Sequence, residues 1–218
     1  QLRPDPASID EFIERGRRLD QRKQVLAAHA ELAAVTLDGH RILVGANVSS
    51  SLDLTTFPIE QCDGIGLLRT EFLYMERREF PSEEEQFRLY RRVIEQLGGR
   101  PLTLRTLDVG ADKRLPYLKT PIEQNPALGW RGLRITLEWQ DLLRAQLRAA
   151  MRASAVGPLR IMLPMVTSFE EVKAVREIFE RLRVQLCEQG YEIARDLPLG
   201  VMVEVPSSIF VLEEIVEL

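Results

Sequence analysis

The chain has 218 residues, which is enough for one large domain with a substantial hydrophobic core. Its formal net charge is -4, whereas general nucleic-acid binders are usually basic, so we expect no nucleic-acid partner and only a local anion site. The two cysteines provide no disulfide framework, which favours a reducing, cytoplasmic setting, and no apolar run approaches the ~20 residues of a membrane span.

A long, polar helix is predicted at the N-terminal end, from Ser8 to about Leu32. Ser8 and Glu11 fit a capping box, in which a hydroxyl and a carboxylate bind the first free amides of a helix. Because charged residues lie on most of its faces, this helix is typical of a connector between domains. We therefore expect a linker helix over residues 1–33 and a second domain over residues 34–218.

Beyond the linker, strand patterns and helix patterns alternate. A turn at Asp38-Gly39 predicts a small hairpin before the first main strand. The expected strands cover residues 41–48, 65–70, 102–107, 159–166 and 199–205. The expected helices cover residues 52–61, 82–97, 131–136, 139–153, 168–189 and the segment from 206 onward, with capping boxes at Ser82–Glu85 and Ser168–Glu171.

This alternation implies an α/β fold with a parallel sheet that is buried by helices on both faces. A doubly wound sheet can end after five strands, whereas a (β/α)8 barrel needs about eight strands to close. The strand count alone leaves both architectures open.

Polar residues stand where several of the predicted strands end. In parallel α/β folds, ligands bind at the carboxyl ends of the strands, so these residues are candidates for a site. They are Asn47, Arg69, Glu71, Arg105, Asp108 and Glu204. Arginine suits phosphate and carboxylate groups because its rigid fork forms paired, charge-assisted hydrogen bonds. The alternative is that Arg69 and Arg105 form structural ion pairs with Glu71 and Asp108.

Glu204 ends an apolar strand, where an isolated carboxylate is costly to bury unless it is paired or binds a metal ion. Mg²⁺ typically takes one or two protein carboxylates together with substrate oxygens and water. A buried salt bridge to a neighbouring strand fits the pattern equally well.

Two further cations are candidates for binding an anion. Arg131 stands at a predicted helix start, and helix N-termini favour anions. Lys113 lies in the long loop after the third strand, where a solvated surface lysine is the alternative.

Four stretches of the chain, taken in order, resemble one family. They are residues 64–72 (GIGLLRTEF), 105–108 (RTLD), 125–131 (NPALGWR) and 200–204 (GVMVE). Together they resemble the phosphoenolpyruvate-protein phosphotransferases, enzyme I of the bacterial sugar phosphotransferase system, over nearly the whole chain. The resemblance implies a phosphoenolpyruvate-binding (β/α)8 barrel of the TIM type, truncated here after about five strands and preceded by the linker helix.

The resemblance also implies roles for individual residues. Arg69 and Arg105 would hold the phosphate of phosphoenolpyruvate, and Arg131 and Lys113 would add positive charge. Glu204 would be one of two Mg²⁺ ligands. No catalytic residue is expected within this piece, because the family's phosphoacceptor histidine belongs upstream, and the second metal carboxylate and the cysteine proton donor belong downstream.

In the family, the phosphoryl group passes from phosphoenolpyruvate to a histidine of a separate N-terminal domain, and then to a phosphocarrier protein for sugar uptake. The intact barrel domain forms a homodimer, and the enzyme is cytoplasmic. The chain opens with Gln1 and its last residues follow a helical pattern, so we expect an internal piece of a longer polypeptide that is inactive alone. Ala111 and Val205 depart from the family pattern, which has glycine and threonine there.

Other assignments remain open on the sequence. The barrel of a pyruvate phosphate dikinase or phosphoenolpyruvate synthase, or of a nitrogen-regulatory paralogue of enzyme I, would share these motifs. A non-catalytic dimerisation module is the alternative of another class, because a partial barrel leaves unpaired strand edges that invite pairing with another chain.

Overall fold

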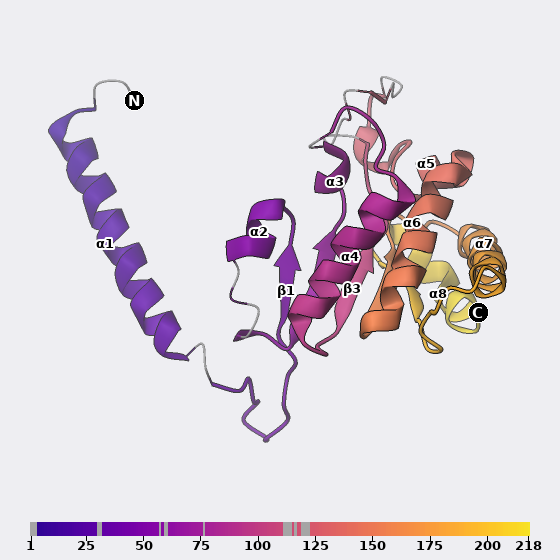
Figure 1. The fold of residues 1–218 in the computed structure, drawn as a ribbon. Coiled ribbons are helices and arrows are strands. Elements are labelled where there is room, and N and C mark those ends of the chain that lie inside the picture. The colour runs from indigo at the N-terminus through magenta and orange to yellow at the C-terminus, as the bar shows by residue number, and fades with distance from the viewer. Residues whose placement is uncertain are drawn as a thin grey trace. The chain divides into compact units, whose positions relative to one another are not determined.

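The computed structural model describes residues 4–29, 32–56, 58, 61–75, 77–110, 115, 117–118 and 123–218 (Figure 1). The chain divides into two compact units, Gln1–Leu43 and Val44–Leu218.

The first unit consists of helix α1 (Pro6–His29) followed by a small turn. The helix starts before the predicted Ser8, and its cap is Asp5, whose carboxylate accepts the amide of Ser8 at 3.0 Å. The predicted capping box of Ser8 with Glu11 is therefore wrong. The physical reason is that Pro6 suits the first helical position, which makes Asp5 the N-cap residue. The predicted hairpin is present as a single antiparallel bridge between Val35 and Arg41.

The second unit is built on a five-stranded parallel sheet. Its strands are β1 (Gly45–Val48), β2 (Gly64–Arg69), β3 (Leu102–Arg105), β4 (Leu159–Leu163) and β5 (Leu199–Val201). They lie in the order β1-β2-β3-β4-β5, with all pairs parallel. A doubly wound sheet reverses its strand order at a switch point, so this sequential order excludes it. The order is that of a (β/α) barrel, as predicted, and the described strands do not close the barrel.

Helices follow the strands in the expected places. They are α2 (Ser51–Thr56), α3 (Phe72–Met75), α4 (Glu83–Leu97), α5 (Leu133–Glu138), α6 (Gln140–Ala153), α7 (Phe169–Glu188) and α8 (Leu212–Val216), with 3₁₀ turns at Pro126–Leu128, Ser154–Val156 and Pro206–Val211. Both capping boxes of this unit, Ser82 with Glu85 and Ser168 with Glu171, are confirmed. The short helix α3 was not predicted.

The helices α4, α6 and α7 pack side by side against one face of the sheet (Figure 1). Their apolar stripes and the strands form a continuous core, in which Leu104, Leu147 and Val175 are fully buried. Each such side chain contributes about 1.5–3 kcal/mol by leaving water. Among the described residues, no helix combines the length and the apolar character needed to cross a membrane.

The expectation that both faces of the sheet are buried is wrong for the described residues. Burial alternates along β1 and along β4, where Arg160 is exposed between buried neighbours. Successive side chains of a strand point to opposite faces. One face therefore meets the helices, and the other is open along these strands.

Several strands end earlier than predicted. β5 ends at Val201, so Glu204 lies in the segment after the strand and not at its last position. The ladder continues only through Met202, whose amide donates to the carbonyl of Leu163 at 2.8 Å. Beyond that bond, Met165 has a positive φ of 57°, and its amide donates to the side chain of Glu204 in place of a backbone carbonyl.

Candidate functional site

The two strand-end arginines are neighbours. Arg69 is the last residue of β2, Arg105 is the last residue of β3, and their Cα atoms are paired in the register of the parallel ladder. The sequence placed both at strand ends, and the sheet brings them side by side. Two adjacent guanidinium groups at one edge of a sheet form a cationic surface suited to an anion with several oxygens.

Arg69 has no hydrogen-bond or ion-pair partner among the residues that the structure describes, and its Nε atom is buried. Buried donors without a partner are rare in proteins, and each calls for an explanation such as a bound ion. The ion pair with Glu71, which the sequence left open for Arg69, is not formed. Arg69 is therefore available to a ligand.

Arg105 is held by carboxylates instead. Its Nη2 atom bonds to Glu71 and lies 3.3 Å from Asp108, and its side chain is only 5% exposed. Its Nη1 atom contacts the sulfur of Met202 at 3.7 Å. The ion pairing with carboxylates that the sequence left open is therefore present for Arg105. Its Nε atom, however, is buried and lacks a hydrogen-bond partner among the described residues.

Arg131 joins the same group through Asp108. The Arg131 Nη2 atom donates to both oxygens of the carboxylate, at 3.0 and 2.9 Å, and Nε donates at 3.1 Å. Gly110 and Gly132, both at positive φ, allow this approach: a Cβ at Gly110 would lie 2.4 Å from the Cβ of Arg131. Arg131 lies just before α5, close to the predicted helix start, and its ion pair with Asp108 holds the side chain.

The charges of these residues do not cancel. The carboxylates of Glu71 and Asp108 balance the guanidinium groups of Arg105 and Arg131, and Arg69 adds a further positive charge. The strand-end cluster, defined as these five residues, therefore carries a net positive charge when all of its side chains are ionised. Next to it, Thr106 Oγ1 is another buried polar atom without a hydrogen-bond partner in the described part of the chain.

Glu204 is an exposed carboxylate whose Oε1 atom accepts the backbone amide of Met165 at 2.9 Å. The left-handed conformation of Met165 directs that amide, and backbone strain of this kind often occurs at functional sites. The predicted alternative for Glu204, a buried salt bridge, is wrong, because the side chain is exposed. Among the described residues, no group of three or more His, Cys, Asp and Glu side chains is placed to hold a metal ion.

Other candidates from the sequence lie elsewhere. Asn47 is an exposed residue within β1. Lys113 lies outside the described residues.

Three residues that the sequence analysis did not single out also bond to the site or to the backbone beside it: Gln146, Thr70 and Met165. For Gln146 a signal existed, because an amide stands on the apolar stripe of α6, where it is fully buried.

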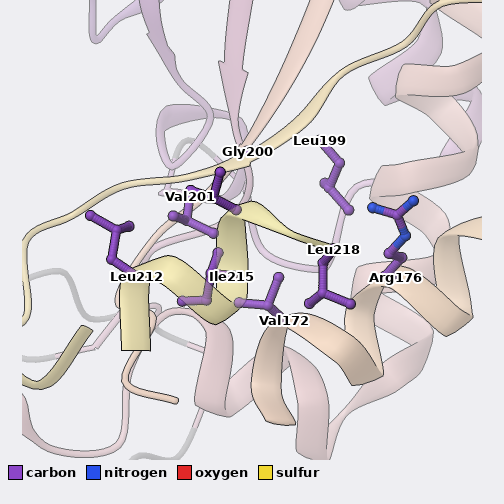
Figure 2. Close-up of a pocket in the computed structure, with 9 residues that line it drawn as sticks. Val172, Arg176, Leu199, Gly200, Val201, Leu212, Ile215 and Leu218 are labelled. Carbon is purple, nitrogen blue, oxygen red and sulfur yellow. The ribbon is translucent and has the colours of Figure 1, made fainter. Parts of the chain in front are cut away.

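A cavity of about 230 Å³ lies between α7, β5 and α8. Figure 2 shows Val172, Val201 and Ile215 facing one another in it, with Arg176 at one side. Of the described residues that line this cavity, only Arg176 is charged, and none is a candidate from the sequence. The cavity is mainly part of the packing at the edge strand.

Comparison with protein families gives a match over residues 23–218 to the description "PEP-utilising enzyme, PEP-binding domain". The match includes every candidate residue of the strand-end cluster as well as Lys113 and Glu204. It also covers both the five strands and the helices that follow them.

Curated relatives carry the name phosphoenolpyruvate-protein phosphotransferase. The chain is 44% identical over 207 residues to the protein of Haemophilus influenzae, and 43% identical over 207 residues to that of Staphylococcus carnosus. The protein of Geobacillus stearothermophilus is 41% identical over the same length. Each match covers 95% of this chain but 36% of the relative, so the chain spans about a third of the length of these relatives.

Proposed function

Because this chain belongs to the PEP-utilising enzymes through their PEP-binding domain, we propose that it binds phosphoenolpyruvate at the carboxyl ends of β2 and β3. The observation that carries the proposal is Arg69, a strand-end cation without a partner among the described residues and in register with Arg105. Phosphoenolpyruvate carries a phosphate and a carboxylate, and charge-assisted, forked hydrogen bonds from arginine suit both groups.

The phosphate is assigned to Arg69 and Arg105. Arg69 offers its whole guanidinium, and the buried Nε atoms of both arginines are donors that lack a hydrogen-bond partner in the described chain. Arg131, which Asp108 holds close to Arg105, adds positive charge at the edge of the site. Lys113 is assigned the same supporting role because it follows Asp108 by five positions in the sequence.

Mg²⁺ is the proposed cofactor, and Glu204 is its proposed ligand. A protein carboxylate such as Glu204 suits this role, because Mg²⁺ commonly takes one or two protein carboxylates and completes its shell with phosphate oxygens and water. Glu204 is exposed, and the amide of Met165 orients its carboxylate. When bound, the ion would neutralise charge on the phosphate oxygens.

For the whole protein, we propose transfer of the phosphoryl group from phosphoenolpyruvate to a protein histidine and then to a phosphocarrier protein. In the first step, the bond between phosphorus and the enol oxygen breaks, a bond from phosphorus to the histidine nitrogen forms, and the enolate takes a proton to give pyruvate. Such transfer is catalysed mainly by positioning and charge neutralisation, which is the work of Arg69, Arg105 and Arg131. The relatives' printed name supports this assignment. Sugar uptake, a cytoplasmic location and a homodimer belong to the same proposal.

The test is a calorimetric titration of phosphoenolpyruvate, with and without Mg²⁺, into the wild-type chain and into Arg69→Met. Arg69→Met should weaken binding at least ~100-fold, since two charge-assisted hydrogen bonds are worth about 3 kcal/mol or more. It should leave the free energy of unfolding almost unchanged, because its guanidinium has no partner among the described residues.

Two control variants sharpen this titration. Arg91→Met removes an exposed arginine of α4 that pairs with Glu95, and it should bind like wild type. Glu204→Gln should bind in the absence of Mg²⁺ as wild type does and lose the gain that Mg²⁺ provides. Wild-type affinity in Arg69→Met, or no binding by the wild-type chain, would contradict the proposed function.

A further inference from the structure

A buried hydrogen-bond chain reaches the two strands of the arginine pair through Gln146 of α6. The Nε2 atom of Gln146 donates to Thr70 Oγ1 at 3.0 Å, and its Oε1 atom accepts the amide of Leu107 at 2.8 Å. Thr70 in turn donates to the carbonyl of Arg105 at 3.0 Å. Gln146 and Thr70 are fully buried, so these bonds do not compete with solvent.

The neighbours of Gln146 fix the orientation of its amide. The backbone N–H of Leu107 can only donate, so the side-chain oxygen must face it, and the nitrogen is left for Thr70 and for Tyr90 at 3.1 Å. The Tyr90 hydroxyl donates onward to Gln86 at 3.0 Å. Burial raises the pKa of Tyr90 well above its ordinary value, so the hydroxyl remains a neutral donor.

These bonds act where the backbone ladder stops. β2 and β3 are paired up to Arg69 and Arg105, and both strands end there. Just beyond, Thr70 ties the end of β2 to the carbonyl of Arg105, and Gln146 holds Thr70 and the amide of Leu107. Thr70 follows Arg69 in the chain, and Leu107 lies between Arg105 and Asp108.

We propose that Gln146 is a positioning residue for the phosphoenolpyruvate site, an inference that rests on the proposed function. The Gln146 side chain holds Thr70, which follows Arg69, and Leu107, which precedes Asp108. Because Thr70 also bonds to the carbonyl of Arg105, Gln146 sets the spacing of the two strand ends that carry the guanidinium groups. Its side chain bonds to Thr70, Leu107 and Tyr90 and acts on the ligand only through the residues beside them. Placement matters because an error of about 1 Å in a binding group can cost ~100-fold.

The test compares Gln146→Met with Gln86→Met, a matched control. Gln86 is an equally buried amide in the same hydrogen-bond chain, but it contacts Tyr74, Tyr90 and Pro81 and not the strand ends. Both variants should lower the melting temperature. Only Gln146→Met should weaken phosphoenolpyruvate binding, by about tenfold or more, whereas Gln86→Met should stay within about twofold of wild type.

A second readout does not depend on the ligand. In amide hydrogen exchange, the Leu107 amide should lose protection in Gln146→Met and keep it in Gln86→Met, because Gln146 is the acceptor of that amide. Wild-type affinity in Gln146→Met, or equal losses of affinity in the two variants, overturns the proposal. If the wild-type chain binds no phosphoenolpyruvate, the proposed function is contradicted. Amide hydrogen exchange then decides the positioning role, which is overturned if the Leu107 amide keeps its protection in Gln146→Met.

Discussion

Two clusters of arginines and carboxylates in this molecule differ in how their cations are paired. The strand-end cluster lies at the carboxyl ends of β2 and β3. The outer cluster joins α4, α6 and the turn after α7, and it consists of Glu83, Glu84, Arg148, Arg152 and Gln189, with the rings of Phe87 and Tyr191.

In the outer cluster, both terminal nitrogens of Arg152 are matched by carboxylates, although its buried Nε atom has no hydrogen-bond partner among the described residues. Arg152 donates to Glu83 and Glu84, both at 2.8 Å, and its guanidinium lies 4.1 Å from the ring centre of Phe87 and 4.7 Å from that of Tyr191. Arg148 donates to Glu83 at 2.6 Å. These contacts join α4, α6 and the turn after α7, and they explain the arginines as parts of the packing.

In the strand-end cluster, the cations outnumber their acceptors. Asp108 serves both Arg105 and Arg131, and Arg69 has no partner in the described chain. Residue type alone therefore does not separate a structural ion pair from a binding site. The separation comes from the partners: a satisfied arginine stabilises the fold, and an unsatisfied one at a strand end is available to a ligand.

The largest expected effect is that of Arg105→Met, which should abolish phosphoenolpyruvate binding and also destabilise the fold. Removing one partner of a buried ion pair costs about 3–5 kcal/mol, because Glu71 and Asp108 lose a cation that compensates them. Urea denaturation measures the stability, and titration of the folded protein measures the binding. A variant that keeps wild-type stability would mean that Arg105 is as free as Arg69, and the contrast between the two arginines would fail.

A smaller effect is expected for Arg152→Met, which should lower stability without changing ligand binding. It should lower the free energy of unfolding by about 1–3 kcal/mol, through the loss of two ring contacts and two ion pairs that are partly buried. Phosphoenolpyruvate affinity should stay at the wild-type value. If affinity fell with stability, the two clusters would be coupled and the outer cluster would not be purely structural.

The smallest effect concerns pH in the outer cluster. The pKa of Glu84 is lowered from its ordinary value of 4.5, first because Arg152 donates a hydrogen bond to it. A lowered pKa in the folded state means that the stabilisation is complete above pH 4.5 and is lost as the pH falls through the lowered pKa. The difference in stability between wild type and Glu84→Gln should therefore be largest at neutral pH and shrink below pH 4.5 in urea denaturation. A difference that is constant with pH would assign the effect of the substitution to packing.

Much of the second unit could be predicted from local patterns. The capping boxes at Ser82 and Ser168, the five strands and the sequential α/β order follow from hydrogen-bonding groups and apolar periodicity within each segment. The predictions that failed depend on neighbours in space. After β5 the amide of Met165, at a positive φ, bonds to the side chain of Glu204 and not to a backbone carbonyl, and the sheet is open on one face because the described helices cover the other.

By itself, the sequence determined the family and the presence of two arginines at strand ends, because motifs and strand boundaries are encoded in contiguous residues. Only the tertiary structure decided which arginine is paired. Glu71 is two residues from Arg69 in the chain, yet it bonds to Arg105 across the sheet, and Gln146 reaches both strands from a distant helix. Such bonds depend on the register of strands and the packing of helices, which no local pattern specifies.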